Sequence, residues 1–186
     1  LKKWPGFNIL GRGLSLDYIQ YSGKPFSGIF DKLTKQANCN IFEKDIIDIF
    51  GNRGSPANFS ALVDYKFTED CYCSKEERNS YICFDFKSHQ ISVYAYSIKS
   101  SNNKDPDFLQ SWVLEGSNDR INWTQLDSHS NDKSLSSDSK IVVFHIQNKS
   151  KSGQSFKYIQ LRITGKSSRG NYYLEILNIE FFGEYF

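Results

Sequence analysis

Hydrophobic and polar residues alternate with a period of two along much of the second half of the chain. The alternation is most regular at residues 80–86 and 91–98. This period is typical of a strand that is buried on one face only. Five further segments also predict strands, at residues 111–116, 121–126, 141–146, 156–163 and 174–182, and the fourth of these alternates over its full length. Many short strands joined by polar loops predict an all-β fold, a β-sandwich of antiparallel strands.

The first part of the chain is less regular. Residues 28–35 place Ile29, Phe30 and Leu33 on one face of a short helix. Residues 70–79 are rich in charged side chains and predict a loop. A length of 186 residues suits one domain with a sizeable core. We therefore expect a single domain over residues 1–186, of which residues 1–60 form an irregular N-terminal part.

One segment, residues 111–127, carries two tryptophans on either side of a polar turn. Two exposed rings would form a platform for a sugar, but rings within the strands of a sandwich are more often core residues. We therefore expect Trp112 and Trp123 to fill the core. We expect Asn118 and Asp119 to make local hydrogen bonds to the backbone of the turn.

Composition supports a β-fold and disfavours some partners. Aromatic residues make up 16% of the chain, with 15 Phe and 11 Tyr, and such rings pack well on a pleated surface. The 23 basic and 21 acidic residues form no basic stripe, so we expect no nucleic-acid partner. The nearest candidate for lipid insertion, Leu109, lies close to Asp107, so we expect no membrane insertion. Methionine is absent even at position 1, which predicts a piece of a longer chain or complex.

The four cysteines, Cys39, Cys71, Cys73 and Cys83, lack the repeated close pairs of a zinc site. A Cys39–Cys83 or a Cys71–Cys83 disulfide would suit an oxidising compartment. Free thiols in a reducing cytosol are the simpler interpretation.

No catalytic constellation is evident. The histidines are scattered, and no hydrolase motif of Ser or Cys lies beside them. We expect His145 to be an ordinary sheet residue and His129 to brace a loop by hydrogen bonding. Glu115 has no second carboxylate at a spacing that indicates the acid–base pair of a glycosidase. The sequence thus predicts no enzyme, no metal site and no cofactor.

Three stretches carry a resemblance to a known family. They are residues 82–87 with 94–99, SWVLEGSNDRINW at residues 111–123, and residues 158–163 with 179–183. They resemble the coagulation factor V/VIII type C, or discoidin-like, domains of the galactose-binding-like superfamily, most clearly over residues 61–186. Those domains usually have Gly after Ser-Asn-Asp, where this chain has Arg120. The resemblance implies a jelly-roll of about eight antiparallel strands that binds ligands through loops at one end, without catalytic residues.

Two loops, at residues 70–81 and 166–173, are therefore the candidate binding surfaces, and we expect them to approach each other. Planar cations, an amide and aromatic rings are suited to a polar ring or a carboxylate. The competing interpretation is that both are solvated loops. The ligand-binding candidates are Tyr72, Arg78, Tyr81, Arg169, Asn171 and Tyr172.

Together these features predict a non-catalytic binding module. We favour a protein-interaction domain of a larger intracellular adaptor or assembly, cytoplasmic or associated with the cytoskeleton, because no targeting signal is evident. The alternative is a carbohydrate-binding, lectin-like module with a glycan partner, at the cell surface or secreted.

Overall fold

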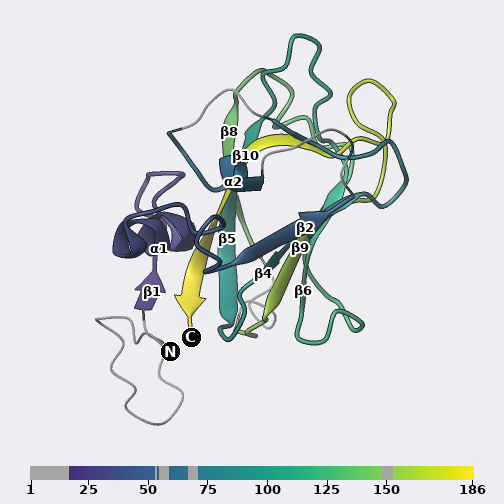
Figure 1. The fold of residues 1–186 in the computed structure, drawn as a ribbon. Helices are drawn as coiled ribbons and strands as arrows, with labels where there is room; N and C mark the ends of the chain where they lie inside the picture. The colour runs from purple at the N-terminus through teal and green to yellow at the C-terminus, as the bar shows by residue number, and fades with distance from the viewer. Residues whose placement is uncertain (1–16, 53, 55–58, 67–70, 148–152) are drawn as a thin grey trace.

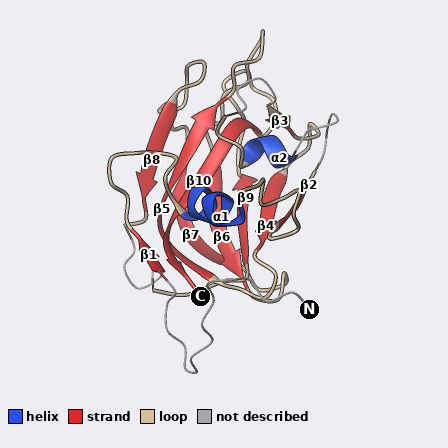
Figure 2. Cartoon of the chain, turned by 60° about the vertical axis from the view of Figure 1, so that its left-hand side comes forward, coloured by secondary structure: helices blue, strands red, loops and turns tan. Residues whose placement is uncertain are grey.

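The computed structural model describes residues 17–52, 54, 59–66, 71–147 and 153–186. Its strands form two antiparallel sheets that face each other as a sandwich (Figures 1 and 2). Sheet A has the strand order β1-β10-β5-β8, and β3 also pairs with β10. Sheet B has the order β2-β4-β9-β6-β7. The strand bounds are β1 Asp17–Ile19, β2 Asp48–Gly51, β3 Tyr72–Cys73, β4 Tyr81–Asp85, β5 Ile91–Ser100, β6 Trp112–Ser117, β7 Thr124–His129, β8 Ile141–His145, β9 Tyr158–Ile163 and β10 Glu175–Tyr185.

The predicted all-β sandwich is confirmed. Each of the seven predicted strand segments overlaps a strand of the structure. The described residues hold ten strands, where about eight were expected. Strands β1, β2 and β3 lie outside the seven predicted segments and are two to four residues long, and β3 lies within the segment predicted as a charged loop. Such short strands carry too few residues for an alternation to be recognisable.

Strand β7 begins three residues later than the alternation predicted. The carboxylate of Asp119 accepts hydrogen bonds from the backbone N–H groups of Ile121 (2.8 Å) and Asn122 (2.7 Å). These bonds hold both residues in the turn, and the Ile121 side chain is 80% exposed. Turn chemistry therefore overrides the strand preference of Ile121.

The core between the sheets contains Trp112, which is fully buried as expected. Its indole Nε1–H donates a hydrogen bond to the hydroxyl of Tyr96 (3.0 Å), which in turn donates to Asp127 Oδ2 (2.9 Å). A buried indole needs such a partner, because an unpaired N–H in the core would lose its hydrogen bond to water. The Trp112 side chain therefore connects β6 of sheet B to β5 of sheet A.

Helix α1 (Ile29–Ala37) confirms the predicted helix, with Ile29, Phe30 and Leu33 buried. The ring of Phe30 lies 5.4 Å from that of Phe84 in sheet B and 5.3 Å from that of Phe181 in sheet A. The helix therefore closes one side of the sandwich, as Figure 2 shows. A second, shorter helix, α2 (Phe59–Leu62), packs against β10 and β3.

The N-terminus of α1 is held by a carboxylate from β10, that of Glu180. Its two oxygens accept hydrogen bonds from the backbone N–H groups of Gly28 (3.1 Å), Phe30 (2.9 Å) and Asp31 (3.0 Å), and of its neighbour Phe181 (2.8 Å). The first N–H groups of a helix have no partner within the helix, so this carboxylate replaces a cap from the sequence before it. Burial raises the pKa of the Glu180 carboxyl to about 7, although the N–H groups of Asp31 and Phe30 favour its ionised form.

Glycine is required at the start of this helix. A β-carbon at Gly28 would lie 2.2 Å from the carbonyl oxygen of Phe181 and 2.7 Å from the Glu180 carboxyl carbon. Only a residue without a side chain lets the backbone approach β10 closely enough to form these bonds.

Neither α1 nor α2, nor any other helix within the described residues, is long and apolar enough to cross a bilayer. Leu109, the candidate for lipid insertion, is buried in the core with 2% of its surface exposed.

Replacing Glu180 by Gln is expected to destabilise the domain by about 3 kcal/mol at pH 8, where the carboxylate is ionised. The amide of Gln would present N–H donors to backbone N–H groups that need acceptors, and buried donors would lose their partners. The free energy of unfolding measured by urea denaturation tests this. Glu184→Gln, on the same strand but partly exposed, is the control and should change stability by less than about 0.5 kcal/mol.

Candidate functional site

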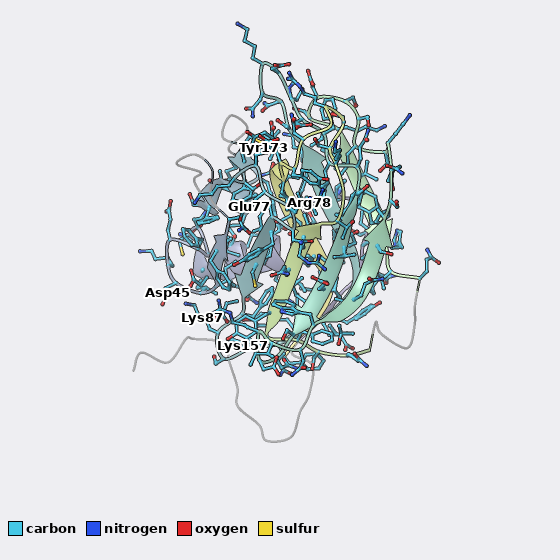
Figure 3. The ribbon with its side chains drawn as sticks, turned by 90° about the vertical axis from the view of Figure 1, so that its right-hand side faces the viewer. Asp45, Glu77, Arg78, Lys87, Lys157 and Tyr173 are labelled. Carbon is cyan, nitrogen blue, oxygen red and sulfur yellow. The ribbon has the colours of Figure 1, made fainter. Side chains whose placement is uncertain are left out.

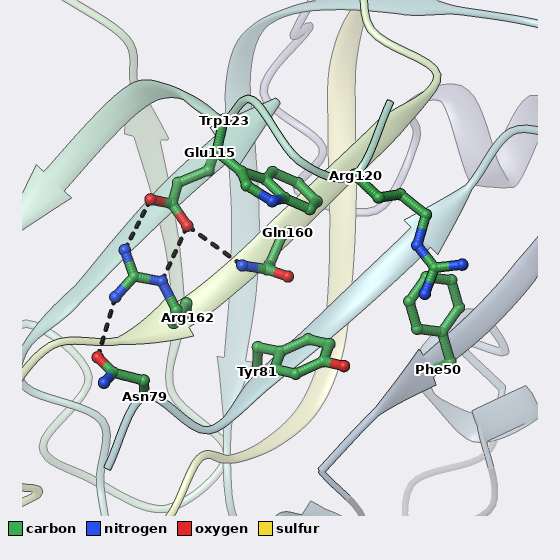
Figure 4. A pocket seen from close by; sticks show the side chains of 8 residues that line it. All are labelled: Phe50, Asn79, Tyr81, Glu115, Arg120, Trp123, Gln160 and Arg162. Atoms are coloured by element: carbon green, nitrogen blue, oxygen red, sulfur yellow. Dashed lines mark hydrogen bonds and ion pairs between the residues drawn. The ribbon is translucent and has the colours of Figure 1, made fainter. Parts of the chain in front are cut away.

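A pocket of about 440 Å³ lies on the outer face of sheet B (Figure 4). Strands β2, β4, β6 and β9 supply its walls together with the turn before β7. We call it the sheet-face pocket, and its lining residues are Phe50, Asn79, Tyr81, Glu115, Arg120, Trp123, Gln160 and Arg162.

The alternation of the strands explains why polar side chains gather here. Leu114 and Leu161 are paired across β6 and β9 and are fully buried in the core. Their neighbours therefore point to the opposite face of the sheet. Glu115 is paired with Gln160 in the same ladder, and Arg162 lies two residues further along β9 on the same face.

The central feature of the pocket is an ion pair with two parallel hydrogen bonds. Arg162 donates through Nε to Glu115 Oε2 (2.9 Å) and through Nη2 to Oε1 (2.7 Å). Gln160 Nε2 donates to Oε2 (3.2 Å), and Arg162 Nη1 donates to Asn79 Oδ1 (3.0 Å). The hydrogen bonds to Glu115 raise the pKa of the Arg162 guanidinium. The network fixes four side chains in one arrangement and neutralises the charges of the pair.

Several polar groups of the pocket remain available to a ligand. Within the described part of the chain, no hydrogen bond is made by Gln160 Oε1, Asn79 Nδ2, the Trp123 indole N–H or the Tyr81 hydroxyl. Trp123 is partly exposed, and its ring lies next to Gln160 in Figure 4. The pocket thus combines an accessible aromatic ring with donors and acceptors in fixed positions.

The expectation that Trp123 belongs to the core is therefore wrong. Trp123 comes just before β7, in the chain that leaves the turn held by Asp119. Because this turn delays the strand, the indole lies at the outer surface of the sheet and not between the sheets. The alternation alone gave no sign of this shift.

The turn itself is built on Ser117 and Asp119. Ser117 Oγ accepts from the backbone N–H groups of Asp119 (3.2 Å) and Arg120 (2.9 Å). Hydrogen bonds to Asp119, those from Asn122 foremost, lower the pKa of its carboxyl. Asp119 thus makes the local bonds that were expected. Asn118 does not: its side chain bonds to Ser155, Lys157 and Gln90, which are distant in sequence.

Arg120 occupies a backbone conformation that favours glycine, with φ +63°. For a residue with a β-carbon, this left-handed conformation is about 1 kcal/mol less favourable than the right-handed one. The turn therefore keeps its form without glycine. The Arg120 guanidinium lies over the ring of Phe50, 4.4 Å from its centroid, at the edge of the pocket.

The four cysteines are free thiols, and neither candidate disulfide is present. Burial raises the pKa of Cys83 to about 12 and that of Cys73 to about 11, and it raises the pKa of Cys71 further still. Thiols with raised pKa values are poor nucleophiles at neutral pH. Cys71, Cys73 and Cys83 are therefore packing residues.

The two predicted binding loops meet at one end of the molecule. The guanidinium of Arg78 lies 5.0 Å from the ring centroid of Tyr172. Figure 3 shows Arg78 on the side of Tyr173, away from Lys87 and Lys157. We call Arg78, Tyr172 and Lys166, whose ammonium lies 6.0 Å from the same ring, the loop-end surface.

The other loop candidates have different surroundings. Tyr72 is 1% exposed, and its hydroxyl contacts the backbone carbonyls of Asn52 and Tyr81 (both 3.2 Å). Its placement at a binding rim is a wrong prediction, because the ring packs in the core. The side chain of Tyr81, by contrast, lines the sheet-face pocket.

Arg169 and Asn171 hold their loop to the loop at residues 100–107. Arg169 forms an ion pair with Asp105, and its backbone N–H donates to Asp107 Oδ1 (3.1 Å). Asn171 Nδ2 donates to Asp107 Oδ2 (3.2 Å). The structure therefore gives both residues contacts that fix the loop end.

His129 ends β7 and lies between two carboxylates. Its Nδ1 is 2.7 Å from Asp132 Oδ2, its Nε2 is 3.0 Å from Asp127 Oδ2, and its ring stacks on Trp112 at 4.3 Å. Burial alone would lower the pKa of the imidazole, but the bonds and charges of Asp127 and Asp132 outweigh burial and raise it. His129 braces the following loop, as expected. No group of three metal-binding side chains occurs in the described segments.

No family model matches the chain. Solved structures with the same fold include two modules of Clostridium perfringens. One is a family 32 carbohydrate-binding module in complex with GalNAc-β-1,3-galactose (10% identity, TM-score 0.58, covering 75% of this chain and 96% of that one). The other is the family 32 module of NanJ in complex with galactose (7% identity, TM-score 0.56, covering 77% and 96%). At these identities the likeness concerns the fold alone, a β-sandwich of the jelly-roll type.

Curated proteins that are similar in sequence include two ubiquitin ligases. They are the E3 ubiquitin-protein ligase Ufd4 of Drosophila melanogaster, 22% identical over 143 residues, and the E3 ubiquitin-protein ligase hecd-1 of Caenorhabditis elegans, 25% identical over 116 residues. The alignments cover 74% and 62% of this chain but only 5% and 4% of those proteins. This chain therefore corresponds to a small part of each.

The two tryptophans are expected to respond differently to substitution. Trp112→Ala should destabilise the domain by about 3–5 kcal/mol, because it leaves a large cavity in the core. Trp123→Ala should cost less than about 1 kcal/mol, because the ring is partly exposed. Urea denaturation of both variants checks this. A cooperatively folded Trp112→Ala protein of nearly wild-type stability would contradict the core assignment.

The stabilising effect of His129 is expected to depend on pH. Its pKa is raised in the folded state, so its contribution is fully present below pH 6.5 and is lost as the pH rises through the raised value. The difference in unfolding free energy between the wild type and His129→Gln should therefore be larger at pH 6 than at pH 9. Equal differences at the two pH values would contradict the ionic role of the imidazole.

Proposed function

We propose that this domain is a non-catalytic module that binds a carbohydrate in the sheet-face pocket. One observation carries the proposal: the accessible indole of Trp123 adjoins polar groups that have no partner within the described residues. The C–H face of a sugar ring packs on an aromatic ring, while its hydroxyls need donors and acceptors around the edge. Gln160 Oε1, Asn79 Nδ2 and the Tyr81 hydroxyl would supply them.

The ion pair of Glu115 and Arg162 gives the pocket a rigid base for this task. Gln160 donates to Glu115, and Asn79 accepts from Arg162, so the ion pair holds both amides in one orientation. A preorganised site loses less side-chain entropy when a ligand binds. The geometry supports recognition of a ring with several hydroxyl groups.

The pocket favours binding over hydrolysis. Among the described residues, Glu115 is the one carboxylate that lines it, and hydrolysis of a glycosidic bond commonly needs two carboxyl groups on opposite sides of the bond. The side chain of Glu115 is also committed to Arg162. We therefore infer that the domain holds its ligand without transforming it.

The fold neighbours agree with this proposal, since their names specify galactose and GalNAc-β-1,3-galactose as ligands. We also propose that this domain is related to the discoidin-like domains that its sequence resembles. A carbohydrate ligand would favour a cell-surface or secreted location over the intracellular one that the sequence favoured.

A glycan array followed by calorimetric titration of the strongest hit tests the function. The wild-type domain should bind at least one class of saccharide, and Trp123→Ala should weaken that binding by about tenfold or more. Tyr18→Ala is the matched control, because Tyr18 is an exposed aromatic residue (59%) on β1 of the other sheet. Unchanged binding by Trp123→Ala would contradict the assignment to this pocket.

The loop-end surface is a second candidate, for a protein ligand. Its cations Arg78 and Lys166 flank the ring of Tyr172, an arrangement suited to an acidic peptide. The sequence similarity to short parts of two ubiquitin ligases is the observation that favours a protein-interaction role. Arg78→Ala and Tyr172→Ala should then abolish co-purification of a stoichiometric partner and leave glycan binding intact. Loss of glycan binding in these variants would instead assign the sugar site to the loop end.

A further inference from the structure

We propose that the sheet-face pocket selects saccharides that carry an acidic group, a carboxylate or a sulfate, and that Arg120 is the residue that selects them. The inference rests on the carbohydrate-binding function proposed above and specifies its ligand class. It follows from the charge, the contacts and the backbone conformation of a single side chain.

The charges of the pocket leave Arg120 without a counterion. Three charged side chains of the described residues line the pocket, and two of them, Glu115 and Arg162, neutralise each other. Within the described ranges Arg120 has no carboxylate at ion-pair distance and no acceptor for its guanidinium N–H groups. Its chain neighbour Asp119 is occupied by the hydrogen bonds of the turn.

Other acidic side chains on this face of the sheet lie near lysines. Asp85 Oδ1 is 3.8 Å from the ammonium of Lys157, and Asp48 Oδ2 is 4.0 Å from that of Lys87. Both lysines lie toward the end of the molecule opposite Arg78 in Figure 3. The lining of the pocket therefore keeps one net positive charge.

The contacts of Arg120 orient its guanidinium for a planar anion. It lies 4.4 Å from the ring centroid of Phe50 and 5.8 Å from that of Tyr158. Stacking on an aromatic face restrains the plane of the group and leaves its N–H edge accessible. This edge matches two oxygens of a carboxylate or a sulfate, with two parallel charge-assisted hydrogen bonds.

The backbone at Arg120 gives an independent argument. The turn uses the N–H group of residue 120, which donates to Ser117 Oγ, and glycine would supply the same group at φ +63° without strain. The arginine side chain therefore adds strain without serving the turn. Local strain at the edge of a pocket is typical of a functional residue.

The test is an array of saccharides in matched neutral, carboxylated and sulfated forms, followed by titration of the best matched pair. The wild-type domain should bind the acidic member about tenfold or more tightly than the neutral one, and high salt should reduce this preference. Arg120→Gly should bind both members equally, at the affinity of the wild type for the neutral member. Arg120→Lys should retain part of the preference, because it keeps the charge but loses the planar edge.

The Arg120→Gly substitution should change ligand preference without destabilising the domain. Glycine adopts the left-handed conformation freely, so Arg120→Gly should unfold at the same or a higher urea concentration than the wild type. Lys104→Ala removes one positive charge from an exposed loop outside the pocket and should leave the preference unchanged.

Two results would overturn the inference while leaving the proposed function in place. One is equal affinity of the wild type for neutral and acidic members, and the other is an acidic preference that survives in Arg120→Gly. If the folded wild type binds no saccharide of any form, the carbohydrate function fails, and this inference fails with it.

Discussion

Each central strand of sheet B separates two environments, and this constraint shapes both the core and the candidate site. In β6, the side chains of Trp112 and Leu114 point into the core. The side chain of Glu115, which follows Leu114, points to the outer face of the sheet. In β9, Leu161 points inward and Arg162 outward. A shift of the register by one residue would bury the ion pair and expose the core, so the hydrophobic effect and the cost of desolvating charges select the same pairing.

The turn after β6 determines how the outer face is used. Asp119 holds the backbone of residues 121 and 122 out of the sheet, which brings Trp123 to the surface beside Gln160. The same turn places Arg120 in the left-handed conformation with its guanidinium over Phe50. One local hydrogen-bonded structure thus positions both an aromatic ring and a cation at the pocket, and neither is part of a strand.

Glu180 has the corresponding role on the other side of the molecule. A carboxylate buried without donors would be costly, but four backbone N–H groups compensate for its desolvation. The bonds attach α1 to β10, and Phe30 then fills the gap between the sheets. The irregular N-terminal part of the chain is thereby joined to the core through a polar contact as well as an apolar one.

The sequence by itself determined the fold class, because seven short segments rich in strand-forming residues and joined by polar loops favour an antiparallel β-sandwich. It also identified the apolar face of α1 and the burial of Trp112. It could not identify the pocket. Glu115 and Arg162 are 47 residues apart in the chain, and their contact depends on which strands are neighbours. Tertiary structure likewise decided that Tyr72 is a core residue and that Trp123 is not. Both outcomes follow from long-range pairing and from one turn, whose hydrogen bonds outweigh the local strand preference.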